Sequence, residues 1–167
     1  GNLQDAELSY SKAIAIKPDF ADAHLNRGNV LKDLGNLQDA ELSYRKAIAI
    51  KPDFAEAYSN LGRILQKVGN LYDAINNYMK AIELKKELSI AKLGLIETKG
   101  LICDWSDQET QANWLETLGI EGSSVNPLGL FYYEDNPLKQ LKRSQNFYQE
   151  RFFQKTYSLA SPNNNKI

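Results

Sequence analysis

The sequence has very few of the residues on which disulfide and metal chemistry depend. It contains one cysteine, Cys103, and one histidine, His24. A single cysteine cannot form an internal disulfide, and it is compatible with a reducing compartment. One histidine and one cysteine are also too few soft ligands for a zinc site, so no metal site is expected.

The sequence also lacks an excess of charge of either sign and has no long apolar run. There are 20 Lys and Arg residues against 21 Asp and Glu residues, which leaves a formal net charge of -1. Without a basic run, the chain has no long-range field to attract nucleic acid or an acidic membrane surface. No apolar stretch reaches membrane-spanning length and no signal-peptide pattern is present. We therefore expect a soluble, cytoplasmic protein that binds neither nucleic acid nor membrane.

What the sequence does contain is a repeat with a period of 34 residues. Residues 1–10 read GNLQDAELSY and recur as residues 35–44, while KAIAIKPDFA at 12–21 recurs at 46–55. A looser third copy, GNLYDAINNYMKAIEL, begins at Gly69. A period of this size is typical of stacked helical hairpins, so the predicted fold class is all-α.

The one complete unit, residues 21–54, shows how each hairpin is specified. Its first helix is predicted over 21–34, and Gly35 supplies a turn where positive φ costs little. The second helix is predicted over 37–50 and ends before Pro52. Small residues, Gly28 and Ala40, allow the two helices to approach closely. Larger residues on the same faces fill the seam: Leu25, Leu31, Tyr44, Ala47 and Ile48.

These positions resemble the signature of the tetratricopeptide repeat. The complete unit matches at Gly28, Leu31, Ala40, Tyr44, Ala47 and Pro52. The next unit matches at Gly62, Leu65, Ala74, Tyr78 and Ala81, but has Lys86 in place of the proline. The opening half unit matches at Ala6, Tyr10, Ala13 and Pro18. The resemblance implies a right-handed α-solenoid with a half repeat at 1–20, repeats at 21–54 and 55–88, and a closing helix at 89–102.

The opening half unit has no partner helix within the sequence. Gly1 falls at the turn inside a repeat, so residues 1–20 form a second helix whose apolar face should be exposed. We expect further repeats upstream, and self-association or fraying of this helix in the present chain. The alternative is a natural start with a self-capping helix.

The last part of the chain, after residue 101, is rich in aromatic residues and lacks the repeat. Ser106 to Glu109 reads SDQE, a capping box that predicts a helix to about Leu118, stopped at Gly119. Asn126–Pro127 can start a short turn through residue 132. Asn136–Pro137 can start a longer helix to about residue 156, and the acidic pair at 134–135 beside it favours capping over acid–base catalysis. We interpret 103–160 as a helical connector and 161–167 as a linker.

Short motifs in this connector resemble the connecting segment of bacterial O-linked N-acetylglucosamine transferases of the SPINDLY-like group. They are CDWSD at 103–107, VNP at 125–127, EDNP at 134–137 and QL at 140–141. In that family the segment joins the repeats to a two-lobed nucleotide-sugar glycosyltransferase, which lies beyond this chain. The parent enzyme would then use a UDP-sugar donor, whereas this chain holds no catalytic or cofactor-binding residue and should be inert alone.

The residues that could carry chemistry have simpler interpretations. His24 occupies a repeat position that Tyr58 fills in the next unit, which favours a packing role over a general base. For Cys103 we expect a buried structural thiol. Trp105 and Trp114 could stack on a sugar or base, but an aromatic core is the favoured interpretation.

Binding of a polypeptide is better supported. Asn26 and Asn60 share a repeat position, and a carboxamide can satisfy both groups of an extended peptide unit. In the resembled transferases an asparagine ladder in the concave groove holds substrate polypeptide, although Gly94 breaks it here. The alternative is that these asparagines only hydrate an exposed helix. Asn29 and Arg63 on the neighbouring stripe could contact acidic side chains, as could Lys32, for which a solvated charged face is the favoured interpretation.

Two hypotheses of function follow from this sequence. In the first, the chain recruits extended substrate polypeptide for a protein O-linked N-acetylglucosamine transferase-like enzyme. In the second, it is a non-enzymatic adaptor that scaffolds a protein complex. Attachment of the repeats to some other enzyme is a third possibility.

Overall fold

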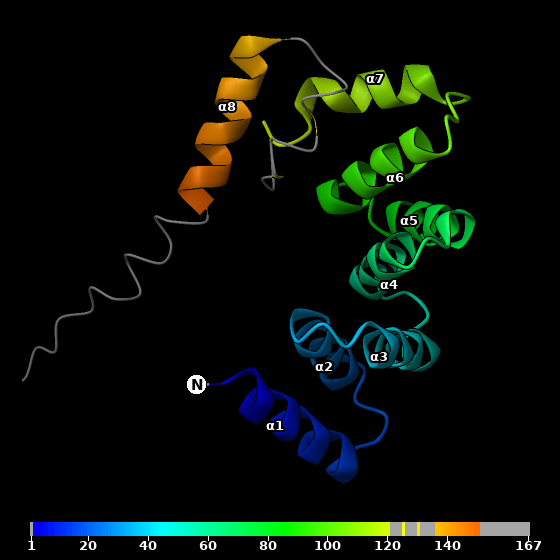
Figure 1. Cartoon of the computed structure of the whole chain (residues 1–167), viewed down its shortest axis with the longest axis vertical. Coiled ribbons are helices and arrows are strands. Elements are labelled where there is room, and N and C mark those ends of the chain that lie inside the picture. Colours follow the sequence, from blue (N-terminus) through cyan, green and yellow to red (C-terminus); the bar gives the residue numbers. More distant parts are fainter. Residues whose placement is uncertain (1, 121–124, 126–129, 131–135, 151–167) are drawn as a thin grey trace, which may run out of the picture. The chain divides into compact units, whose positions relative to one another are not determined.

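The computed structural model of this chain describes residues 2–120, 125, 130 and 136–150. The chain forms two compact units, Gly1–Trp105 and Ser106–Ile167. All regular elements are helices, and no β-strand occurs among the described residues (Figure 1). The predicted all-α class is therefore confirmed.

The first unit is a stack of helical hairpins (Figure 1). Each helix packs on the next one along the chain, with the tightest pairs formed by α2 with α3 and by α4 with α5. The predicted bounds at 37–50 are confirmed, while the first helix of the complete unit and the closing helix each end one residue earlier than predicted. The six helices are α1 (Leu3–Ile16), α2 (Ala21–Asp33), α3 (Leu37–Ile50), α4 (Ala55–Lys67), α5 (Leu71–Leu84) and α6 (Ser89–Leu101).

The turn between α2 and α3 follows from local chemistry. Gly35 has a φ of +82°, the left-handed conformation that a residue with a Cβ rarely adopts. The Asn36 amide then donates to the Leu31 carbonyl at 2.9 Å, which satisfies a free carbonyl at the end of α2. Asn36 also caps α3, because its side-chain oxygen accepts from the Asp39 amide at 3.3 Å. The turn therefore depends on only a few neighbouring residues.

The seam between the two helices of a hairpin is closely packed. Tyr44 and its neighbours Ala40 and Ala47 are fully buried. A Cβ placed on Gly28 would lie 2.6 Å from Cε1 of Tyr44, so only glycine leaves room for this ring. The predicted close approach at Gly28 is confirmed. Gly28 allows the two helices to approach closely, and the ring of Tyr44 fills the space between them.

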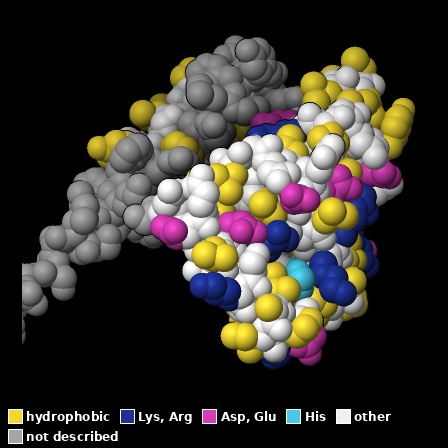
Figure 2. Space-filling model, turned by 60° about the horizontal axis from the view of Figure 1, so that its bottom comes forward, with side chains coloured by type: hydrophobic (Ala, Val, Ile, Leu, Met, Phe, Trp, Pro, Cys, Tyr) yellow, Lys and Arg dark blue, Asp and Glu magenta, His cyan; other side chains and the backbone are white. Residues whose placement is uncertain are grey.

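Helix α1 has the sequence of α3 except for Ser11 in place of Arg45, yet none of its residues is buried. The reason is tertiary, because α3 packs on both α2 and α4 whereas α1 packs on α2. Leu8 is 52% exposed and Ile16 is 86% exposed. Figure 2, in which the α1 end comes forward, shows hydrophobic side chains on this surface. The predicted exposed apolar face is present, and self-association through it stays a prediction.

The second unit contains α7 (Gln108–Thr117) and α8 (Pro137–Tyr148). The predicted capping box is wrong: Asp107 occupies the N-cap position and makes no side-chain capping bond. The box would place the N-cap at Ser106, one residue before the observed N-cap. The stop at Gly119 is confirmed by a φ of +73°. Asn136 caps α8 as predicted, accepting from the Lys139 amide at 3.2 Å.

Several predictions on the connector fall outside the described residues. These are the turn at 128–132, of which Leu130 alone is described, the acidic pair at 134–135, the helix beyond residue 150 and the linker at 161–167. Of the VNP motif, Val125 alone is described.

Side-chain donors from the second half of α8 bond to backbone carbonyls at the end of α7. Arg143 is fully buried, and its Nε donates to the Leu118 carbonyl at 2.8 Å. Its Nη2 donates to the Leu115 carbonyl. Asn146 adds a bond from Nδ2 to the Ile120 carbonyl at 2.6 Å. A cation at a helix C-terminus is favoured by the helix dipole, and here it also satisfies carbonyls that the helix leaves free.

Candidate functional site

The predicted binding residues lie on the first helices of two successive hairpins. Asn26 and Asn29 are three residues apart on α2, which places them on one face, and Asn60 and Arg63 repeat this spacing on α4. All four side chains are partly exposed. We call this set, Asn26, Asn29, Asn60 and Arg63, the asparagine face.

A hydrogen bond joins the two helices across this face. Nδ2 of Asn60 donates to Oδ1 of Asn29 at 3.0 Å, and the hydroxyl of Tyr44 donates to the same oxygen at 2.9 Å. The bonded pair is therefore Asn29 with Asn60, not the repeat equivalents Asn26 and Asn60. Nδ2 of Asn29 and Oδ1 of Asn60 make no hydrogen bond among the described residues, so one donor and one acceptor remain for a ligand.

Arg63 is the cation of the asparagine face. Among the residues that the structure describes, it makes no hydrogen bond and no ion pair. It lies near the buried rings of Tyr44 and Tyr78, and its charge acts on Glu97, the residue at the same repeat position on α6. Burial raises the pKa of the Glu97 carboxyl, and Arg63 and a hydrogen bond with Gln66 offset part of that rise. The face thus offers a guanidinium whose donors are unused.

Three polar groups beside the asparagine face were not predicted from the sequence. They are the Tyr44 hydroxyl, Gln66 and Glu97. The repeat period could have found two of them. Gln66 lies 34 residues after Lys32, and Glu97 lies 34 residues after Arg63. Gln66 accepts from the Tyr78 hydroxyl at 3.3 Å, as Asn29 accepts from Tyr44 one hairpin earlier, although the acceptor comes from a different repeat position. Lys32 pairs with Asp33 at 3.3 Å and is not part of the face.

Replacing Glu97 with glutamine should stabilise the protein at neutral pH and leave it unchanged in acid. Because folding raises the pKa of Glu97, the folded state binds the proton more tightly than the unfolded state. The stability that this provides is complete below about pH 4 and is lost as the pH rises through the folded pKa. Urea unfolding of both proteins at acidic and neutral pH measures the difference.

The control for this change is Glu87→Gln, since the Glu87 side chain is 91% exposed and its loss of charge should matter little. A Glu97→Gln protein that is less stable than the parent at neutral pH would contradict the predicted increase in stability.

The histidine, the cysteine and the two tryptophans lie outside the asparagine face. His24 is buried, and its Nε2 lies 2.9 Å from the Pro18 carbonyl, which confirms the packing role. The prediction that Cys103 is buried is wrong, because its side chain is exposed. It follows the end of α6 in a left-handed turn with a φ of +55°, where the chain leaves the helix. Trp105 is 50% exposed, so the expectation of a core position is wrong for it also, while Trp114 is partly buried.

Two further kinds of site are absent from the described part of the chain. No group of three or more His, Cys, Asp or Glu side chains is placed to share a metal ion there. Nor does any described helix combine the length and apolar character needed to cross a bilayer.

Comparison with solved structures shows the same kind of fold in several proteins. The first repeat domain of Spaghetti (RPAP3), bound to the HSP90 peptide SRMEEVD, is 22% identical with a TM-score of 0.59 over 60% of this chain and 80% of its own. MamA is 19% identical with a TM-score of 0.62 over 96% of this chain and 92% of its own. A variant of the Thermobaculum terrenum O-GlcNAc transferase is 22% identical with a TM-score of 0.59, over 76% of this chain but 26% of its own.

Comparison with protein families gives the assignment. The TPR repeat profile matches residues 1–35 and 28–69, and the tetratricopeptide repeat profile matches residues 55–88. A search of curated proteins finds no matching sequence. The matches run without a gap through α1 to α5, and the packing of these helices is that of stacked hairpins. The chain therefore belongs to the tetratricopeptide-repeat proteins.

Proposed function

We propose that this chain binds an extended segment of another polypeptide along the asparagine face. The observation that carries the proposal is the bond between Asn60 and Asn29, which fixes two carboxamides from successive hairpins beside one another. Each retains one unused group, a donor on Asn29 and an acceptor on Asn60. A peptide unit presents the complementary pair, so main chain can bind here with little dependence on its side chains.

Arg63 gives this face a preference for polypeptide segments that carry an acidic side chain. Its guanidinium has five N–H donors in a planar fork, which suits a carboxylate better than any neutral group. An acidic side chain in the bound segment would therefore pair with Arg63. The similar fold of the RPAP3 repeat domain supports this proposal, since that protein is seen with a peptide that contains acidic residues.

Substituting Asn26 and Asn60 together by alanine should weaken peptide capture and leave the helicity intact. A peptide selected from a random display library supplies the ligand, and calorimetry gives its affinity. We expect a loss of about tenfold, about 1.4 kcal/mol, because the change removes the free acceptor on Asn60 and the neighbouring carboxamide of Asn26 on the same face. Asn76→Ala on the exposed surface of α5 is the matched control and should bind normally. Unchanged affinity in the Asn26→Ala, Asn60→Ala protein would remove the asparagine face from the proposal.

We further propose that the parent protein is a cytoplasmic, O-linked N-acetylglucosamine transferase-like enzyme, to which this chain supplies the substrate-recruiting repeats and a connector. The connector motifs support this, as does the fold shared with the Thermobaculum terrenum enzyme, of which the match covers 26%. The UDP-sugar donor and the catalytic groups would belong to the rest of that protein. Reading the coding sequence beyond residue 167 tests the proposal, because a long segment of alternating strands and helices is required.

The alternative is an adaptor that uses the same face to scaffold a complex. The likeness to MamA favours it, because a fold of this length accounts for 92% of that protein. An early stop codon after residue 167 would decide for the adaptor. A different catalytic domain there would indicate that the repeats serve another enzyme.

A further inference from the structure

The first unit carries a second surface feature that the asparagine face does not use. It is a shallow groove between the second helices α3 and α5, with α4 beneath it. Leu61 at its floor and Arg63 of the asparagine face are two residues apart on α4, which puts them about 200° apart around the helix. We call it the α3/α5 groove, and its lining residues are Arg45, Ile48, Ala49, Tyr58, Leu61 and Asn77.

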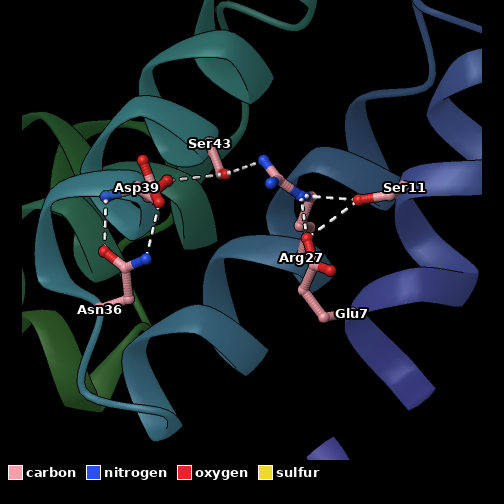
Figure 3. Close-up of polar contacts among 6 residues, drawn as sticks. All are labelled: Glu7, Ser11, Arg27, Asn36, Asp39 and Ser43. Atoms are coloured by element: carbon pink, nitrogen blue, oxygen red, sulfur yellow. Dashed lines mark hydrogen bonds and ion pairs between the residues drawn. The ribbon is translucent and has the colours of Figure 1, made fainter. Parts of the chain in front are cut away.

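The repeat provides a direct comparison, because each lining residue has an equivalent 34 positions earlier between α1 and α3. There the side chain of Arg27 rises between the two helices (Figure 3). Its Nε donates to Oε1 of Glu7 at 2.8 Å and to Oγ of Ser11 at 3.0 Å, and its Nη1 donates to Oγ of Ser43 at 3.3 Å. The bond from Arg27, followed by that from Ser11, lowers the pKa of Glu7. The earlier position is therefore occupied by the chain itself.

In the α3/α5 groove a glutamate occupies the position equivalent to Glu7, but its cationic partner comes from a different repeat position. Leu61 stands at the position of Arg27, and Arg45 stands at the position of Ser11. Nε of Arg45 donates to Oε1 of Glu41, the equivalent of Glu7, at 2.8 Å. The ion pair is thus formed along one edge of the groove. The centre, which Arg27 fills in the earlier hairpin, contains only the shorter and buried Leu61.

The groups left around the groove define what it can hold. The floor is aliphatic and aromatic, formed by Ile48, Ala49, Leu61 and the ring of Tyr58. On one edge Arg45 is half exposed, and Glu41 uses only its Nε, so both η nitrogens lack an acceptor among the described residues. On the opposite edge Nδ2 of Asn77 donates to the Asp73 carbonyl, which leaves Oδ1 to accept.

We propose that the α3/α5 groove binds an apolar side chain of a partner polypeptide that is followed by an acidic residue. The apolar side chain fills the space that Arg27 fills one hairpin earlier, and its burial on Leu61 and Ile48 provides the affinity. The neighbouring carboxylate pairs with the free η nitrogens of Arg45. A peptide N–H of the partner donates to Oδ1 of Asn77. This surface is independent of the asparagine face, so either can exist without the other.

The test uses the whole chain labelled with ¹⁵N and the probe acetyl-Leu-Glu-methylamide at millimolar concentration. We expect saturable shifts of the amide resonances of Ile48, Ala49, Leu61 and Asn77. The probe acetyl-Leu-Lys-methylamide should bind at least tenfold more weakly, since its charge is repelled by Arg45. Equal binding of the two probes, or no saturable shift at these residues, would overturn the proposal.

A pair of variants makes the test specific to the groove. Arg45→Ser with Leu61→Arg copies the residues at positions 11 and 27, an arrangement that this fold already accepts, and should fill the groove and weaken the acidic probe at least tenfold. Ser11→Arg with Arg27→Leu makes the reverse exchange and should produce new shifts at Ile14 and Ala15. Undiminished binding by the first variant would overturn the assignment. Asn26→Ala with Asn60→Ala should bind the probe normally, which separates this proposal from the proposed function.

Discussion

Replacing Gly28 with alanine should lower the free energy of unfolding of the repeat unit by about 2 kcal/mol. The new Cβ would lie 2.6 Å from Cε1 and 2.8 Å from Cδ1 of Tyr44, far inside normal contact. The ring cannot move aside because Tyr44 is fully buried and its hydroxyl is bonded to Asn29. The clash outweighs the gain of about 1 kcal/mol that alanine normally brings to a helix. Urea unfolding followed by circular dichroism measures the change.

Gly62→Ala is the internal control for this prediction. At that repeat position the new Cβ would lie 3.0 Å from the ring of Tyr78, so a shift of a few tenths of an ångström relieves it. The helix-propensity gain then offsets the strain, and we expect a change below about 1 kcal/mol. If both substitutions proved equally harmless, the close packing at Gly28 would not limit the stability. Loss of peptide binding in the Gly28→Ala protein is also expected, since a displaced Tyr44 no longer holds Asn29.

Replacing Arg143 with methionine should destabilise the second unit by about 3 kcal/mol. Methionine fills much of the space but donates no hydrogen bond, so the carbonyls of Leu115 and Leu118 lose the donors that Arg143 provides. Buried carbonyls without a partner are costly, and the favourable cation at the end of α7 is lost as well. Hydrogen exchange measured by mass spectrometry should show faster exchange in α7 and α8, while α2 to α5 keep their protection.

Lys142→Met removes the same charge from the adjacent, exposed position and should leave the exchange of α7 and α8 unchanged. Protection of α7 that survives Arg143→Met would show that the other contacts in this unit suffice without the arginine.

The hairpins could be predicted closely because their signals are local. Gly35 permits the turn, Asn36 caps the next helix, and alternating small and large residues define the seam, all within a few residues of one another. The start of α7 could not be predicted in the same way. The SDQE motif is locally sufficient for a capping box, but the chain leaves α6 through a left-handed turn at Cys103 and enters the helix only at Gln108. The same turn exposes a thiol that composition alone suggests to be buried.

The candidate site shows the same division. The repeat period located Asn26, Asn29, Asn60 and Arg63 on first helices, but it could not predict that Asn29 would bond with Asn60. That contact joins residues 31 apart, and it depends on how far successive hairpins rotate about the stack. This rotation is set by the volumes of the side chains that pack between helices. Each seam is formed by side chains of two helices, so the pattern of one helix does not predict it.

The amino-acid sequence is enough to predict the helical class, the approximate bounds of the repeat helices and the faces on which the binding candidates lie. These properties follow from backbone conformations and from a periodicity that each segment carries alone. Which donor and acceptor atoms remain free to bind a ligand depends instead on the packing of the helices. Two nearly identical helices, α1 and α3, differ in burial because their neighbours differ, and one exchange of Arg27 for Leu61 leaves the next groove open. Hydrogen bonds and burial depend on which side chains meet across helices, so they are settled by packing.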